Sequence, residues 1–114
     1  MPYILRIAAV AALLVIAGLG LAQAQQVTGV DERQKAYDAA FQDTLQDPAN
    51  LDKLFRFAVL SAETGDLEGA ISALERILVI NPDLPRVRLE LGILYFRLGS
   101  YEAAQTYLET ALAS

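Results

Sequence analysis

The sequence repeats itself at a spacing of 34 residues over its second half. Pro48 recurs as Pro82, and Gly65 recurs as Gly99. Six further identities share this offset: Leu60/Leu94, Glu68/Glu102, Ala70/Ala104, Leu74/Leu108, Glu75/Glu109 and Leu78/Leu112. A period of about 34 residues, with a glycine in the middle and a proline at the end, is typical of repeats that contain two antiparallel helices each. Such repeats bury a core between neighbours, which constrains the chain to a stack of helix pairs.

Apolar residues at helical spacing, separated by turn and capping residues, predict an all-α fold. Asn50 or one of its neighbours is expected to start one helix, and Asp66 is expected to cap the next. Gly65 is expected to take the left-handed conformation that ends a helix, and Pro85 is expected to begin the first helix of the second copy. No stretch shows the sustained alternation that a β-strand with one buried face requires.

The two copies, counted from Leu51 and from Pro85, resemble the tetratricopeptide repeat (TPR). The family's small-residue positions fall on Ala58, Ala70, Gly92, Ala104 and Ala111, and its large-residue positions on Leu54, Phe57, Leu74, Leu91, Tyr95 and Leu108. Three positions depart from the pattern: Ser61 replaces an aromatic residue, Ile77 a small one and Arg88 a large apolar one. The resemblance implies an antiparallel helix-pair solenoid of about two units, preceded by one further helix.

The first residues have the pattern of a secretory signal peptide. Arg6 precedes the apolar run 7–22, and Ala22 and Ala24 supply the small residues that precede a cleavage site. The apolar run is shorter than the roughly 18–20 residues that a spanning helix needs. We therefore expect export to the periplasm with cleavage after Ala24. The alternative is a membrane tether formed by an uncleaved segment.

These patterns divide the chain into five segments. The predicted segments are a signal peptide (1–24), a flexible leader (25–30), an N-terminal half-repeat or capping helix (31–47), a first repeat (48–82) and a second repeat (83–114).

The composition argues against catalysis. The chain contains no cysteine and no histidine, which excludes thiol chemistry, histidine acid–base chemistry and the usual zinc sites. No glycine-rich phosphate loop is present, and Glu75 and Glu109 are interpreted as solvated helix charges. We therefore predict a protein that is not an enzyme, with no catalytic residue, no metal site and no cofactor. The net charge of −5 disfavours nucleic acid as a partner.

The resemblance also implies where a partner binds, because in this family the first helix of each repeat lines a groove. The candidate groove residues are Phe55, Val59, Leu89, Ile93, Phe96, Arg86 and Arg97. The alternative for the apolar members is ordinary packing against the 31–46 helix or a neighbouring unit. Three positions reverse charge between the copies, which predicts lateral ion pairs for Asp52/Arg86, Arg56/Glu90 and Glu63/Arg97.

The sequence therefore predicts a non-enzymatic scaffold of the bacterial cell envelope that binds a protein or peptide partner. The alternative is the N-terminal periplasmic repeat segment of a larger outer-membrane or export-assembly protein. Membrane contact is expected only through the signal peptide or through a missing barrel. Because the last helix is apolar and lacks a polar cap, self-association through it is a further expectation.

Overall fold

The structure, a computed structural model, describes residues 29–113. The expected signal peptide and most of the expected leader lie outside these residues. The chain divides into two compact units, residues 1–33 and 34–114, and the helix pairs belong to the second. Every regular element of the described part is a helix, which agrees with the all-α prediction.

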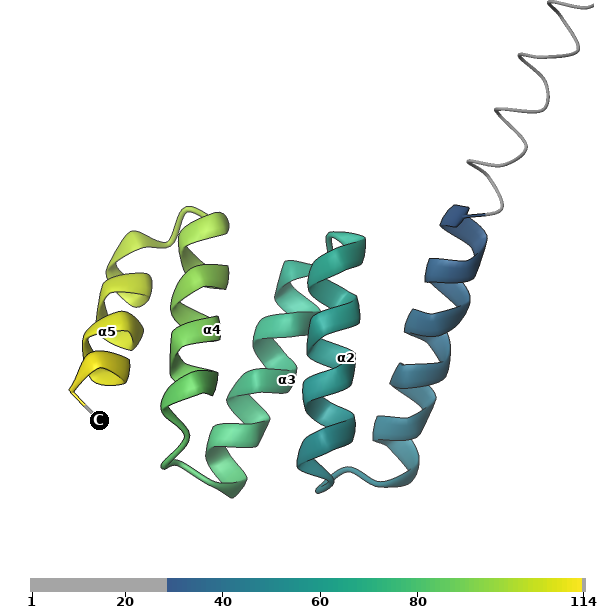
Figure 1. The fold of residues 1–114 in the computed structure, drawn as a ribbon, viewed down its shortest axis with the longest axis horizontal. Helices are drawn as coiled ribbons and strands as arrows, with labels where there is room; N and C mark the ends of the chain where they lie inside the picture. Colours follow the sequence, from purple (N-terminus) through teal and green to yellow (C-terminus); the bar gives the residue numbers. More distant parts are fainter. Residues whose placement is uncertain (1–28, 114) are drawn as a thin grey trace, which may run out of the picture. The chain divides into compact units, whose positions relative to one another are not determined.

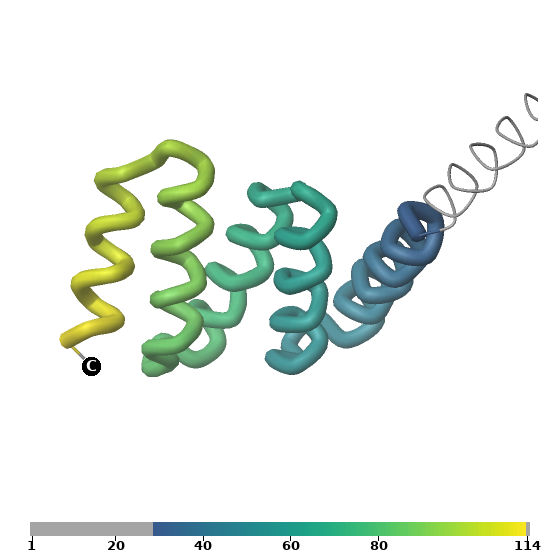
Figure 2. The backbone as a smooth tube through the Cα atoms, turned by 45° about the horizontal axis from the view of Figure 1, so that its top comes forward, coloured from purple at the N-terminus to yellow at the C-terminus, as the bar shows by residue number. Residues whose placement is uncertain are grey.

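The helices of the second unit form successive antiparallel pairs (Figure 1). A first helix covers residues 29–46 of the described part, so residues 29 and 30, predicted to belong to the leader, are helical. Four helices follow: α2 (Leu51–Thr64), α3 (Leu67–Ile80), α4 (Pro85–Arg97) and α5 (Tyr101–Leu112). The helix α2 packs against α3, α3 against α4, and α4 against α5. Figure 2 shows the same order from another side. The predicted helix-pair solenoid is confirmed.

The helix ends follow the predicted capping chemistry. The Asn50 side-chain oxygen accepts a hydrogen bond of 3.1 Å from the Lys53 N–H, which caps α2. Asp66 caps α3 by accepting a 3.0 Å hydrogen bond from the Gly69 N–H. Gly65 ends α2 at φ 90°, in the left-handed region that favours glycine. Because these turns are short, each helix packs antiparallel to the helix before it.

Ser61 stands where the family pattern has an aromatic residue, and residues outside the repeat supply the missing aromatic surface. Ser61 is fully buried, and its hydroxyl oxygen has no hydrogen-bond partner among the described residues. Its counterpart in the second copy is Tyr95. At the first junction the aromatic surface comes instead from the helix that ends at residue 46. The rings of Tyr37 and Phe41 lie 5.3 and 5.6 Å from that of Phe57.

A tyrosine donates to a carboxylate at two junctions, one between the helix that ends at residue 46 and the first helix pair, and one between the two helix pairs. The Tyr37 hydroxyl donates to Asp66 over 2.8 Å, and the Tyr95 hydroxyl donates to Glu75 over 2.5 Å. The Tyr95 ring also stacks on Tyr107, with 5.6 Å between centroids. The hydrogen bond to Glu75, together with burial, raises the pKa of Tyr95 from 10.0 to about 12. The α3–α4 junction therefore depends on a protonated hydroxyl.

This dependence predicts a loss of stability in alkali. The unfolded chain loses the Tyr95 proton near its ordinary pKa of 10.0, whereas the folded chain keeps it to about 12. The stabilisation is thus complete below the lower value and is lost as the pH rises towards the higher one. We expect the free energy of unfolding, measured in urea, to fall more steeply between about pH 10 and pH 12 for the wild type than for Tyr95→Phe. Parallel pH profiles for the two proteins would contradict this assignment.

Candidate protein-binding groove

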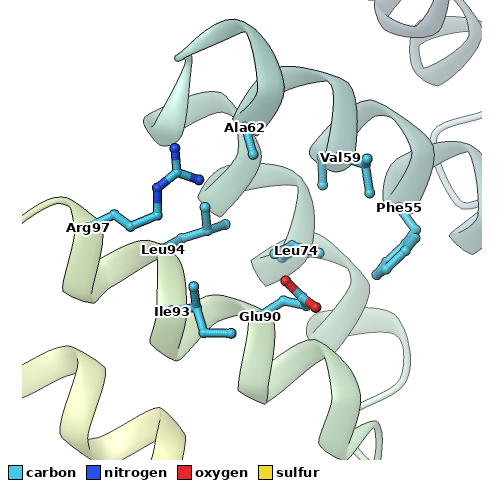
Figure 3. Close-up of a pocket in the computed structure, with 9 residues that line it drawn as sticks. Phe55, Val59, Ala62, Leu74, Glu90, Ile93, Leu94 and Arg97 are labelled. Carbon is cyan, nitrogen blue, oxygen red and sulfur yellow. The ribbon is translucent and has the colours of Figure 1, made fainter.

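A shallow depression of about 80 Å³ lies between α2 and α4. The helix α2 contributes Phe55, Ala58, Val59 and Ala62, α3 contributes Leu74, and α4 contributes Glu90, Ile93, Leu94 and Arg97. Figure 3 shows the α2 side chains on one wall and the α4 side chains opposite, with Arg97 towards the Ala62 end and Glu90 nearer Phe55. The spacings follow helical periodicity, so each helix turns one continuous stripe towards the depression.

The walls of the depression are apolar and accessible. Val59 and Ile93 are each 43% exposed, whereas Leu74 and Leu94 beneath them are buried. Exposed apolar side chains above a buried floor can contact an apolar group of another molecule without any rearrangement of the core.

A second cleft of about 350 Å³ adjoins the depression at Phe55, which borders both. Its lining consists of Leu51, Asp52, Phe55, Ile77, Leu84, Pro85, Arg86 and Val87. The Arg86 guanidinium carbon lies 5.7 Å from the centroid of the Phe55 ring, within the range of a cation–π contact. We call the depression and this cleft together the groove.

The predicted lateral ion pairs are wrong. Within the described part of the chain, none of the pairs Asp52/Arg86, Arg56/Glu90 and Glu63/Arg97 forms a salt bridge. A salt bridge that does occur there joins Lys53 of the first repeat to Asp47, which precedes that repeat, over 3.8 Å. The physical reason is that exposed pairs gain only about 0–1 kcal/mol, which does not outweigh competing contacts such as that of Arg86 with Phe55.

The structure brings together most of the predicted groove residues and leaves two apart. Phe55, Val59, Ile93 and Arg97 border the depression, and Arg86 borders the cleft. The exceptions border neither: Leu89 is exposed, and the Phe96 ring packs edge-on against Tyr101 at 5.4 Å.

Sequence analysis did not place Glu90 and Leu74 in the groove. For Glu90 a signal exists, because it precedes Ile93 by three residues and Arg97 by seven, and so lies on the same face of α4. For Leu74 there is none, since it lies on the second helix of its repeat, which the family pattern does not assign to a groove.

The groove provides apolar surface and balanced charge rather than reactive groups. Each part contains one acidic and one basic side chain, Glu90 with Arg97 and Asp52 with Arg86. No group of three or more residues able to bind a metal ion occurs among the described residues. This arrangement suits the binding of an apolar segment of another molecule.

Comparison with known proteins agrees with the fold. Residues 58–114, half of the chain, match the family Tetratricopeptide repeat. The chain belongs to the tetratricopeptide repeat family. No curated protein matches the chain.

The chain is also similar to solved structures of MamA. One shares 26% identity with a TM-score of 0.66, and the match covers 75% of this chain and 50% of that one. Another shares 21% identity with a TM-score of 0.68 and covers 75% of this chain and 46% of that one. The chain therefore spans about half the length of the MamA structures that it matches.

Membership in this family defines the class of the protein. The tetratricopeptide repeat is a protein–protein interaction scaffold and is typically non-catalytic. Within residues 29–113, no helix has the length and apolar character required to cross a membrane.

Because Arg97 forms no salt bridge with Glu63, reversing its charge is expected to leave the fold intact. Arg97 is the basic residue in the last turn of α4, so Arg97→Glu loses only a favourable charge at the helix C-terminus, and we expect it to lower the free energy of unfolding by less than about 1 kcal/mol. Leu94→Ala, one turn earlier but buried, provides the contrast and should cost about 2–5 kcal/mol. Urea denaturation at low and high salt measures both. A loss above about 1 kcal/mol for Arg97→Glu, suppressed by salt, would restore the ion-pair hypothesis.

Proposed function

We propose that the protein is a scaffold of the bacterial cell envelope whose groove between α2 and α4 binds a segment of a partner protein. The observation that carries the proposal is the pair of exposed aliphatic side chains, Val59 and Ile93, which face each other across a depression with a buried floor. Such a surface excludes water when an apolar side chain enters it, and that burial drives binding.

The size of the depression indicates the kind of ligand. Its volume of about 80 Å³ is well below the roughly 300–1,000 Å³ of pockets that enclose small molecules. A single aliphatic side chain of a peptide suits it better than a cofactor. The adjoining cleft at Phe55 can take a second apolar side chain of the same segment.

The charges indicate how the partner is selected. Because Glu90 and Arg97 balance each other, and Asp52 and Arg86 do likewise, the groove exerts little net attraction on a charged segment. The partner segment is therefore amphipathic, with its apolar side chains setting the affinity and isolated charges setting its register.

The predicted signal peptide supports a location in the envelope. The signal-peptide pattern of residues 1–24 predicts a mature chain that begins at Gln25. Periplasmic proteins can form disulfide bonds, but this chain contains no cysteine, so the stability of its fold comes from helix packing.

The proposal predicts site-specific crosslinking to a partner. A photoreactive phenylalanine analogue placed at position 93 should crosslink to a distinct periplasmic or envelope protein in intact cells. Val59→Glu should abolish that adduct, because a carboxylate on the opposite wall would have to be buried against the ligand. Position 79 serves as the matched control, since Val79 is exposed on α3 and borders neither part of the groove.

Two outcomes would contradict the proposal. One is the absence of any adduct at position 93. The other is an adduct that persists in the Val59→Glu variant or forms equally at position 79. Retention in the cytoplasm would contradict the proposed location while leaving the groove untouched.

A further inference from the structure

A pocket of about 240 Å³ lies between α3 and the helix that ends at residue 46. Its lining includes Tyr37, Phe41 and Leu45 from that helix, Phe57 from α2, and Ala73 and Arg76 from α3. All of these residues lie in the second compact unit. Among the described residues, the pocket shares no lining residue with the groove. We call it the inter-helix pocket.

Hydrogen bonds join the walls of the inter-helix pocket at both ends. Tyr37 donates to Asp66 at the start of α3, and the Arg76 guanidinium donates to the Pro48 carbonyl oxygen over 3.2 Å. Because Pro48 follows Tyr37 by eleven residues and Arg76 follows Asp66 by ten, the two walls run in the same direction. The pocket is therefore bounded by contacts within the folded chain.

The second repeat shows how the same position is filled there. Tyr107 stands at the position of Ala73, and its ring stacks on Tyr95 with 5.6 Å between centroids. Burial and the Glu75 carboxylate raise the pKa of Tyr107, so its hydroxyl lies close to α3. In the first repeat the two stacked tyrosines are replaced by Ala73 and Ser61, whose side chains carry no ring. An aromatic ring is therefore the group that this position accommodates.

The walls of the inter-helix pocket suit an aromatic ring. Phe41 and Leu45 are exposed, whereas Phe57 and Ala73 are buried. The rings of Tyr37 and Phe41 each lie beside that of Phe57, within the spacing of favourable aromatic pairs, and a further ring can join them. The volume is below the roughly 300–1,000 Å³ of pockets that enclose small molecules, which favours one side chain of a protein segment.

The two ends of the inter-helix pocket have opposite charge. At one end the hydrogen bond to Asp66, burial and the charge of Asp38 raise the pKa of the Tyr37 hydroxyl, so both carboxylates lie near it. At the other end Arg76 has five N–H donors, so it can bind a carboxylate while it donates to Pro48. A segment with a cation towards Asp66 and an anion towards Arg76 is complementary to this surface.

We propose that the inter-helix pocket binds a phenylalanine side chain of a partner protein, in a segment where a basic and an acidic residue flank the phenylalanine. The ring enters beside Ala73, the position that Tyr107 fills in the second repeat. Phenylalanine suits the pocket better than tyrosine, because Phe41 stands where the second repeat has the carboxylate of Glu75. This surface is separate from the groove and does not rest on the proposed function.

The probe is the pentapeptide acetyl-Lys-Ser-Phe-Ser-Glu-amide, together with the peptide of reversed order. Alternate side chains of an extended segment point to the same side, so both charges flank the ring on one face. Each peptide would be titrated into the isotope-labelled full chain, and NMR chemical shifts would follow binding. We expect at least one order to give saturable shifts centred on residues 41–45 and 72–76. Replacing the phenylalanine of that peptide by alanine should abolish them.

Substitutions within the inter-helix pocket should prevent binding. Ala73→Tyr installs the ring of the second repeat and should abolish the shifts, and its spectrum without peptide reports whether the variant is folded. Leu45→Glu is an independent variant at an exposed position, where the new carboxylate would pair with Arg76, and it should weaken binding at least about tenfold. Val79→Glu, exposed on α3 outside the pocket, and Val59→Glu in the groove are matched controls and should bind normally.

The contact with Arg76 is tested by a double-mutant cycle. Arg76→Gln in the protein should weaken binding about threefold, and so should replacing the peptide glutamate by glutamine. Combining the two changes should cost no more than either alone, since both remove one contact. Additive losses would contradict the assignment of the carboxylate to Arg76.

Three results would overturn the proposal. The first is failure of both peptides to bind. The second is binding that survives Leu45→Glu or a folded Ala73→Tyr, or that Val59→Glu abolishes, because the peptide would then lie outside the inter-helix pocket. The third is self-association of the full chain that Leu45→Glu reverses, since a second copy would then fill the pocket. Loss of groove crosslinking with intact peptide binding would affect only the proposed function.

Discussion

The close approach of α4 to α5 at Gly92 is the constraint on which the second repeat depends. A methyl group at Gly92 would lie 2.6 Å from the Leu108 Cγ and 3.3 Å from the Ala104 carbonyl oxygen. Only the absence of a side chain allows the two helices to pack this tightly. The close packing of α4 on α5 also orients the Tyr95 side chain. Its ring stacks on Tyr107 of α5 while its hydroxyl donates to Glu75 of α3. One small residue thus connects the packing within a pair to the junction between pairs.

The groove depends on a second contact, the packing of α3 against both of its walls. Its two walls are first helices, and their separation is set by the second helix that lies between them in sequence, α3. Leu74 on α3 forms the floor, so the packing that builds the core also determines the depth of the depression. A surface of this kind is rigid before it binds. Less ordering is then required when a partner segment arrives.

Sequence alone predicted the parts of the fold that local chemistry controls. The helix start near Asn50, the capping of α3 by Asp66 and the left-handed conformation of Gly65 each require only a short stretch of chain, and each was found as predicted. The ion pairs failed because the 34-residue offset fixes which positions are equivalent but not where long side chains point. Phe41 and Tyr37, which provide the aromatic surface beside Phe57 in the first copy, lie outside the repeat pattern. Only the packed structure could reveal that compensation.

The candidate site was predicted in part, for a related reason. One apolar stripe along α4 contains Leu89, Ile93 and Phe96. The helical spacing alone cannot show which of these three residues border the groove. The structure does so, because Ile93 borders the groove whereas Leu89 and Phe96 do not. The groove itself contains balanced charges, with one acidic and one basic side chain in each part.

The most direct test of this account is a double-mutant cycle on the free energy of unfolding at Gly92 and Leu108. Clash with Leu108 predicts that Gly92→Ala destabilises the protein by about 1–3 kcal/mol. In the background of Leu108→Ala, which makes room for the methyl group, the same substitution should cost at least about 1 kcal/mol less. If the helices do not approach closely, Gly92→Ala should instead stabilise α4 by up to about 1 kcal/mol, as in an exposed helix. That result would contradict the close packing of α4 against α5 on which the second repeat depends.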